Sequence, residues 1–197
     1  MIGSVLNFLR TTLDGELRRD AEESANEKVV FVDGDKMEPL EFKLGAVSML
    51  LVNVEEERVL RPGDRYSRTS SDGTVSRVFP EIRLQLQLLF VARFKRYDEA
   101  WDQLAGVISH FQSRPYYDHH NTPGLSAGVQ KLIFELRTLS FAEQNEIWNA
   151  LRVSHHPSVL YRVSMLVLRD AQGDAPAVAA GESRRRLGML GESGGEG

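Results

Sequence analysis

The chain has 197 residues, of which 42% are hydrophobic and 26% charged, and its formal net charge at pH 7 is -4. This is the composition of an ordinary globular domain, and the negative balance argues against a nucleic-acid-binding surface. The absence of cysteine excludes disulfides, thiolate zinc sites and cysteine nucleophiles. The N-terminus lacks a signal-peptide pattern, and the longest apolar stretch, residues 44–54, is too short to span a bilayer. We therefore expect a soluble protein made in the cytoplasm, without a membrane partner.

The first third of the chain predicts one helix and two strands. Apolar residues recur at helical spacing between Ile2 and Leu17, on one face of the helix. Residues 28–32 form a short apolar strand that ends at a turn signal, and residues 47–55 predict a second strand apolar enough to lie inside a sheet. Residues 56–79 are rich in Arg, Ser, Asp and Gly, and we interpret them as a mobile excursion or the tip of a hairpin.

The segment 81–114 predicts a strand, a turn and an amphipathic helix. Apolar and polar side chains alternate in residues 82–90, while Leu89 and Val91 make the second face apolar too, so we expect this end to be covered on both sides. A strand that leads directly into a helix predicts a helix packed back on its own sheet. Its apolar stripe, which we expect to be buried in the core instead of forming a ligand platform, is Tyr97, Trp101, Leu104, Ile108 and Phe111.

Three further elements follow a loop at residues 115–128, which contains one short extended piece at Tyr116 and Tyr117. Residues 129–139 alternate in hydrophobicity and predict a strand, with a helix as the alternative. Ser140 and Glu143 form a capping box, and the expected buried face of the helix that it opens is Phe141, Ile147, Trp148 and Leu151. Residues 160–168 predict the last strand.

This order of elements predicts an α+β fold. Because strands and helices do not alternate strictly, we expect a mixed or antiparallel sheet of four to five strands with about three helices packed on it. We expect one domain over residues 1–169 and a disordered tail over residues 170–197, which contains no aromatic residue.

A search for catalytic or metal-binding residues gives no site. His119–His120 and His155–His156 are adjacent pairs, whereas two ligands on one helical face need a spacing of three or four, and His110 lies beside an apolar stripe. We interpret all five histidines as loop or helix-edge residues. Glu55, Glu56 and Glu57 follow a strand whose side chains alternate faces, so we interpret them as a solvated strand end and not a catalytic pair.

Four stretches of the sequence carry a resemblance to a known family: LVNVEEERVLR (51–61), LQLQLLFVARFKRYDEAWDQLAGVISHFQ (84–112), NTPGLSAGVQKLIFELRTLSFAEQNEIWNAL (121–151) and PSVLYRVSML (157–166). In this order, they resemble the N-terminal domain of the cap, or tail-terminator, proteins of phage-tail-like contractile injection systems, of the virulence-cassette and antifeeding-prophage type. The resemblance covers about residues 1–170. The segment 61–78 departs from the family by being longer and more polar.

The resemblance implies a structural protein and not an enzyme, with no catalytic residue, metal or cofactor. Such proteins form a ring, expected to be a hexamer, on the last layer of the inner tube, contact the last layer of the sheath, and end polymerisation. The protein would be assembled in the cytoplasm and then be part of the contractile particle. The alternatives are an adaptor protein elsewhere in the particle, such as the baseplate, and a metal-assisted hydrolase that uses His119, His120 and a glutamate.

We expect the subunit and tube contacts at exposed strand ends and loops, because a rigid sheet presents these segments to partners. The candidate interface residues are Glu55, Glu56, Glu57, Arg58, Arg61, Arg65, Tyr116, Tyr117 and Asn121. Opposite charges on neighbouring subunits would fix the register of a ring more than its affinity.

Overall fold

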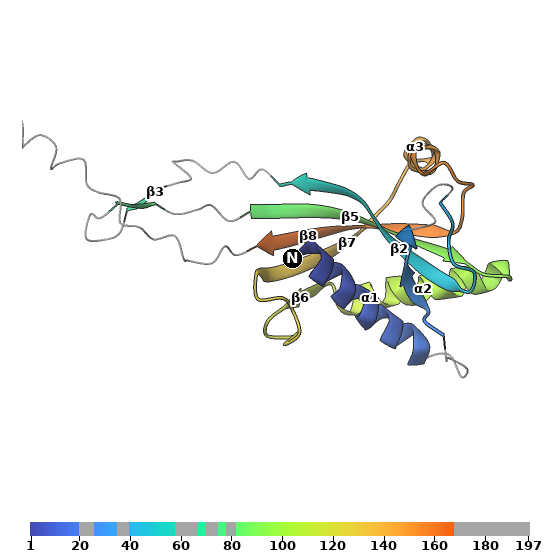
Figure 1. The fold of residues 1–197 in the computed structure, drawn as a ribbon, viewed down its shortest axis with the longest axis horizontal. Coiled ribbons are helices and arrows are strands. Elements are labelled where there is room, and N and C mark those ends of the chain that lie inside the picture. Colours follow the sequence, from blue (N-terminus) through green and yellow to red (C-terminus); the bar gives the residue numbers. More distant parts are fainter. Residues whose placement is uncertain (20–25, 35–39, 58–66, 70–74, 78–81, 168–197) are drawn as a thin grey trace, which may run out of the picture. The chain divides into compact units, whose positions relative to one another are not determined.

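A computed structural model describes residues 1–19, 26–34, 40–57, 67–69, 75–77 and 82–167. The chain divides into two units, residues 1–58 with 81–168, and residues 59–80 with 169–197 (Figure 1). In the second unit, the described residues form an antiparallel hairpin of β3 (Ser67–Thr69) and β4 (Val75–Arg77). A hairpin was one of the two predictions for this segment. The predicted tail, residues 170–197, lies outside the described residues.

The first unit contains a six-stranded sheet in the order β1-β2-β5-β8-β7-β6. Its strands are β1 (Val29–Phe31), β2 (Ala46–Glu56), β5 (Ile82–Arg93), β6 (Tyr116–Asp118), β7 (Val129–Arg137) and β8 (Ser158–Val167). β1 pairs with β2 in parallel, and the other four pairings are antiparallel. The predicted α+β fold with a mixed sheet is confirmed. The sheet has more strands than predicted because the short extended piece at Tyr116 pairs with β7.

The helices α1 (Ile2–Arg19) and α2 (Tyr97–Ser113) cover one face of the sheet, which we call the helix face, and α3 (Phe141–Leu151) lies on the opposite, α3 face (Figure 1). The main core lies under α1 and α2 and includes Leu9, Leu13, Phe90, Leu104 and Val163. The two helices approach closely at Gly106, where an added Cβ would lie 2.6 Å from a methyl carbon of Leu17. As predicted, the helix that follows β5 packs back on its own sheet.

A second core lies on the α3 face. Leu89 and Val91 of β5 are buried there together with Trp148 of α3, in a cluster that also contains Leu40, Phe42 and Leu160. The prediction that this end of β5 is covered on both faces is therefore confirmed. The capping box at the start of α3 is also confirmed, since Ser140 N donates to Glu143 Oε2 (2.8 Å) and Glu143 N donates to Ser140 Oγ (3.3 Å).

Three predictions about helix faces are wrong. Tyr97 and Trp101 are 72% and 42% exposed, because the buried side of α2 is centred on Ala100, Leu104 and Val107 and is rotated relative to the aromatic stripe. Phe141 is 91% exposed. It is the first residue of α3, and the helix turns its later residue Trp148 towards the sheet.

The prediction for His110 is also wrong, because its side chain is buried in the core and does not lie at the edge of the helix. Its partner there is Tyr117, which supplies the hydrogen bond that a buried imidazole requires. None of the helices in the described ranges is long and apolar enough to cross a membrane.

Candidate interaction surface

The structure places the described candidate residues in two clusters: Glu55, Glu56 and Glu57 at the end of β2, and Tyr116, Tyr117 and Asn121 in and after β6. The order of the strands puts these clusters on opposite sides of the sheet, with β5, β8 and β7 between them. The other three candidates, Arg58, Arg61 and Arg65, lie outside the described residues.

The two clusters occupy the same level along the strands. Glu55 is aligned through Gln85, Ser164 and Ile133 with Tyr116 at the far edge. The neighbouring row runs in the same way from Glu56 to Tyr117. Strands in a sheet lie about 4.8 Å apart, so the four pairings separate the two edges by about 19 Å. The same rows of the sheet therefore have one candidate cluster at their β2 end and the other at their β6 end.

A side-chain amide caps the edge of β2. β1 pairs with β2 only between Val47 and Met49, so the later part of β2 has no outer strand within the described residues. Glu57 N donates to Arg83 O of β5. Because successive residues of a strand direct their backbone groups to opposite sides, the backbone groups of Val54 point away from β5. Val54 N donates to the side-chain oxygen of Asn53 (2.9 Å), whose own amide donates to Glu55 Oε1 (2.7 Å). Asn53 thus accepts the outward-facing N–H group of Val54, which an outer strand would otherwise accept.

The edge of β6 has the same kind of cap. Phe134 N of β7 donates to Pro115 O, so the backbone groups of Tyr116 and Asp118 point outward. The amide of Asn121 satisfies both, because its Nδ2 donates to Tyr116 O (3.2 Å) and its Oδ1 accepts from Asp118 N (3.0 Å). The Asp118 carboxylate accepts the backbone N–H groups of Asn121 and His120, and these hydrogen bonds lower the pKa of Asp118.

The side chains of the two tyrosines in β6 point to opposite faces of the sheet. Tyr117 is 3% exposed and lies in the helix-face core, where burial raises its pKa to about 12. Tyr116 is exposed and lines a hollow of about 360 Å³ together with Arg114 and Asn121. Tyr117 therefore belongs to this edge by its backbone alone, whereas the ring of Tyr116 is exposed on the surface.

The β2 edge is acidic, whereas the β6 edge carries charges of both signs, because the Asp118 carboxylate lies across from Lys131. Glu55 and Glu56 are exposed at the β2 edge. At the β6 edge, Lys131 Nζ lies 4.6 Å from the centroid of the Tyr116 ring, and the more than half exposed Arg114 has its Nη2 3.8 Å from Glu16 Oε1 of α1. A cation over an aromatic ring is held in place while it keeps its charge available to solvent or a partner.

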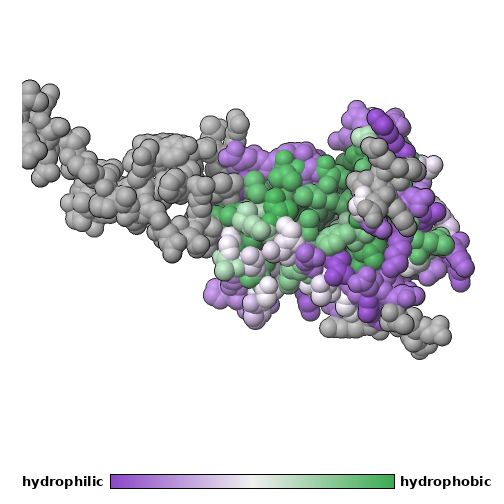
Figure 2. All heavy atoms as spheres, viewed as in Figure 1, coloured by the Kyte–Doolittle hydropathy of each residue, from purple (hydrophilic) through white to green (hydrophobic). Residues whose placement is uncertain are grey.

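An exposed apolar area lies beside the β2 edge. Figure 2 shows hydrophobic side chains gathered over β2 and β5, next to the beginning of α1. The partly exposed apolar residues in this part of the helix face are Ile2, Leu6, Leu51, Val54 and Leu84. Apolar areas of this kind, with charged residues at their rim, are typical of protein–protein contacts.

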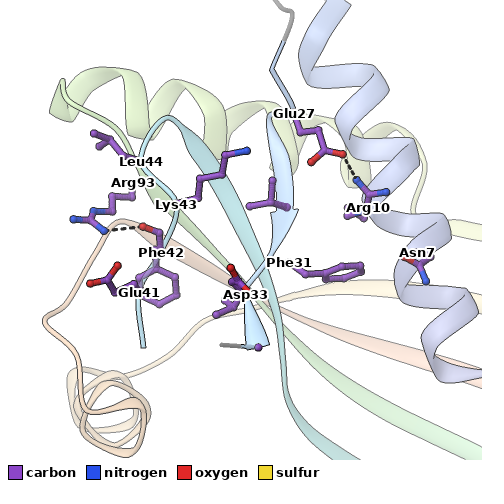
Figure 3. Close-up of a pocket in the computed structure, with 13 residues that line it drawn as sticks. Asn7, Arg10, Glu27, Phe31, Asp33, Glu41, Phe42, Lys43, Leu44 and Arg93 are labelled. Atoms are coloured by element: carbon purple, nitrogen blue, oxygen red, sulfur yellow. Dashed lines mark hydrogen bonds and ion pairs between the residues drawn. The ribbon is translucent and has the colours of Figure 1, made fainter. Parts of the chain in front are cut away.

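A larger groove of about 810 Å³ runs along β1, between α1 and residues 41–44 (Figure 3). Both arginines that line it have partners within the chain, since Arg10 Nη1 donates to Glu27 Oε1 (3.0 Å) and Arg93 Nη1 donates to Phe42 O (2.7 Å). The guanidinium carbon of Arg10 also lies 5.8 Å from the centroid of the Phe31 ring. None of the predicted site residues lines this groove.

The histidines do not come together. His119 and His120 are exposed in the loop after β6, while His155 and His156 lie near Trp148 on the α3 face. In the part of the chain that the structure describes, no three His, Asp or Glu residues are grouped so that they could hold a metal ion.

Residues 4–180 match the family model of the Pvc16 N-terminal domain. The chain belongs to this family. The match extends over most of the chain and confirms the resemblance found in its sequence. A comparison with curated proteins gives no match.

Two solved structures have a similar fold. One is the PVC sheath/tube terminator of an extracellular contractile injection system in its extended state, with a TM-score of 0.50 and 17% identity over 95% of this chain and 71% of that chain. The other is the anti-feeding prophage cap, a tube-terminating cap, with a TM-score of 0.48 and 14% identity over 87% of this chain and 58% of that chain. At these identities, the likeness is one of fold.

Proposed function

We propose that this Pvc16-family chain acts as a tail terminator, a structural cap that ends the inner tube and the sheath of a contractile injection particle. The observation that carries the proposal is the family match over residues 4–180. The fold shared with a sheath/tube terminator is consistent with it. The role is structural and not enzymatic, and the partners are further copies of the chain in a hexameric ring, the tube protein and the sheath protein.

Termination requires two different surfaces on one ring. One surface repeats the contact that a tube subunit makes with the layer below, and the other offers no contact to a further layer. A closed ring of head-to-tail contacts uses every lateral surface, so growth cannot continue sideways either. A sheet with a packed core on each face, as found here, is rigid enough to hold such contact residues at constant positions.

The test is the mass of the chain in solution, measured by light scattering with and without purified inner-tube protein from the same particle. We expect a closed ring, either in both samples or only with the tube protein. Gold-labelled chain should then appear by electron microscopy at the end of the particle distal from the baseplate. A chain that stays monomeric with and without the tube protein would contradict the proposal. Labelling at the baseplate end would indicate the adaptor role instead.

A further inference from the structure

We propose that neighbouring copies of this chain join edge to edge, with the end of β2 in one copy against β6 of the next. This inference rests on the proposed cap function, and it names the lateral joint of the ring. The first observation that supports it is that the two edges lie at the same position along the strands, because the row that begins at Glu55 ends at Tyr116. β2 and β6 also run in the same direction, since four antiparallel pairings separate them.

This alignment has a consequence for assembly. A head-to-tail contact forms an open helical filament when each copy is displaced along the axis, and a ring when the rotation closes without displacement. If the strands run along the ring axis, joining the two edges at the same row adds no axial step from one copy to the next. With the strands along the axis, the joint therefore gives a flat ring and not a helical filament.

The side chains at the two edges are complementary. Residues that are aligned across a sheet share a face, so Glu55 and Tyr116 both lie on the α3 face. In the joint, the exposed Glu55 carboxylate of one copy meets the Tyr116 ring of the next, with the Lys131 ammonium held over that ring. The Glu55 carboxylate against the Lys131 ammonium favours the head-to-tail pairing over a pairing of two β2 edges, in which like charges would meet.

The asparagine caps determine what kind of joint this is. Asn53 and Asn121 occupy outward-facing backbone groups of β2 and β6. The caps therefore reduce the number of unpaired backbone groups at these edges, which are the usual sites of uncontrolled association. The joint is made by side chains, and the caps restrict it to the specific contact between Glu55 and the Tyr116–Lys131 pair.

Cysteine cross-linking tests the joint directly, because the natural chain has no cysteine. The double variant Glu55→Cys/Tyr116→Cys carries its two thiols on edges about 19 Å apart, too far for a disulfide within one chain. On treatment of the assembled ring with a short bifunctional thiol cross-linker, we expect a ladder of cross-linked species that stops at the closed ring. A mixture of the two single variants should give cross-linked dimers, while each single variant alone should give none.

The matched control is Glu55→Cys/Phe141→Cys, whose second thiol is accessible on α3, the helix that packs on the middle strands β5 and β8. It should give no ladder. If the edge variant forms a ring with the tube protein but gives no ladder, or each single variant pairs with itself, the joint is wrong and the cap function stands. If wild-type chain neither forms a ring nor binds the tube protein, both proposals are overturned.

A charge exchange tests the contact itself. Glu55→Arg and Lys131→Glu should each place like charges at the joint and weaken ring formation at least about tenfold, measured as the concentration at which half of the chain is in rings. The double variant should restore ring formation. The control Glu146→Arg makes the same change of charge at an exposed position of α3 and should have no effect. A double variant no better than the single variants would overturn the assigned contact.

Discussion

The imidazole Nε2 of His110 lies 2.5 Å from the phenolic oxygen of Tyr117, and both residues are buried. This hydrogen bond joins the last turns of α2 to the edge strand β6. Glu16 of α1 lies on the other side of the ring, with its Oε1 3.7 Å from His110 Nδ1. The position of the β6 edge therefore depends on a polar contact inside the core, made between residues from three elements.

Removing the phenolic oxygen should destabilise the fold. Tyr117→Phe leaves Nε2 of the buried imidazole without its partner, and we expect the free energy of unfolding to fall by about 1–3 kcal/mol. The measurement is urea unfolding followed by circular dichroism. Tyr116→Phe is the matched control, because the exposed hydroxyl can bind water, and it should change stability by less than about 0.5 kcal/mol. Equal losses in the two variants would contradict the role of the buried bond.

Acidification should weaken the same contact. Burial lowers the pKa of His110 below its ordinary value of 6.5, although the nearby Glu16 acts in the opposite direction. The unfolded chain then binds a proton more readily than the folded chain, so the neutral imidazole contributes stability above pH 6.5, and this contribution is lost as the pH falls towards the folded pKa. Unfolding curves at several pH values should show that acidification lowers the free energy of unfolding less in His110→Asn than in wild type. If acidification lowers the free energy of unfolding equally in both proteins, other groups cause the pH dependence.

The two tryptophans should respond very differently to truncation. Trp148 is 5% exposed and packs against Phe42, with ring centroids 6.1 Å apart, so Trp148→Ala should cost about 3–5 kcal/mol. Trp101 contacts Tyr97 on the surface, and Trp101→Ala should cost less than about 1 kcal/mol. Thermal unfolding of both variants measures the difference. A large loss for Trp101→Ala would show that this ring belongs to the core after all.

The tryptophans also show where sequence reasoning reaches its limit. The alternation in β5 and the capping box at Ser140 are local patterns, and both predicted their elements correctly. An apolar stripe indicates that a helix has a buried side, but the partner surface decides how that side is rotated. In α2 the sheet and α1 select Ala100 and Val107. The larger Tyr97 and Trp101 dominate the sequence pattern and lie outside.

The candidate site was predictable only in part. Strand ends can be read from composition, so Glu55 and Tyr116 could be named as exposed candidates. Their alignment on one row depends on the strand order, which places β8 between β5 and β7 and has no local signal. The caps were missed for the same reason, because Asn53 and Asn121 act on backbone groups whose direction is set by pairing.

A single carboxylate should control the attachment of β1 to α1. Asp14 Oδ1 accepts the backbone N–H groups of Lys28 (2.6 Å) and Val29 (3.0 Å), and its Oδ2 lies 2.8 Å from Arg18 Nη2. Asp14→Ala leaves both donors unsatisfied, and we expect a loss of about 2–4 kcal/mol in urea unfolding. Asp14→Asn keeps one acceptor oxygen and should lose less. The explanation fails if the two variants are equally stable, or if hydrogen exchange at Val29 is unchanged in Asp14→Ala.

The asparagine caps should matter more for association than for stability. In the double variant Asn53→Ala/Asn121→Ala, the outward backbone groups of β2 and β6 lose their side-chain partners while the packed core is untouched. Because uncapped strand edges pair with other chains, we expect the variant to associate in a concentration-dependent and open-ended way without tube protein. Light scattering over a concentration series measures this, with Asn145→Ala on the exposed side of α3 as the control. If the double variant scatters like wild type at every concentration, the amides do not protect the edges, and the restriction of the joint to side chains loses its basis.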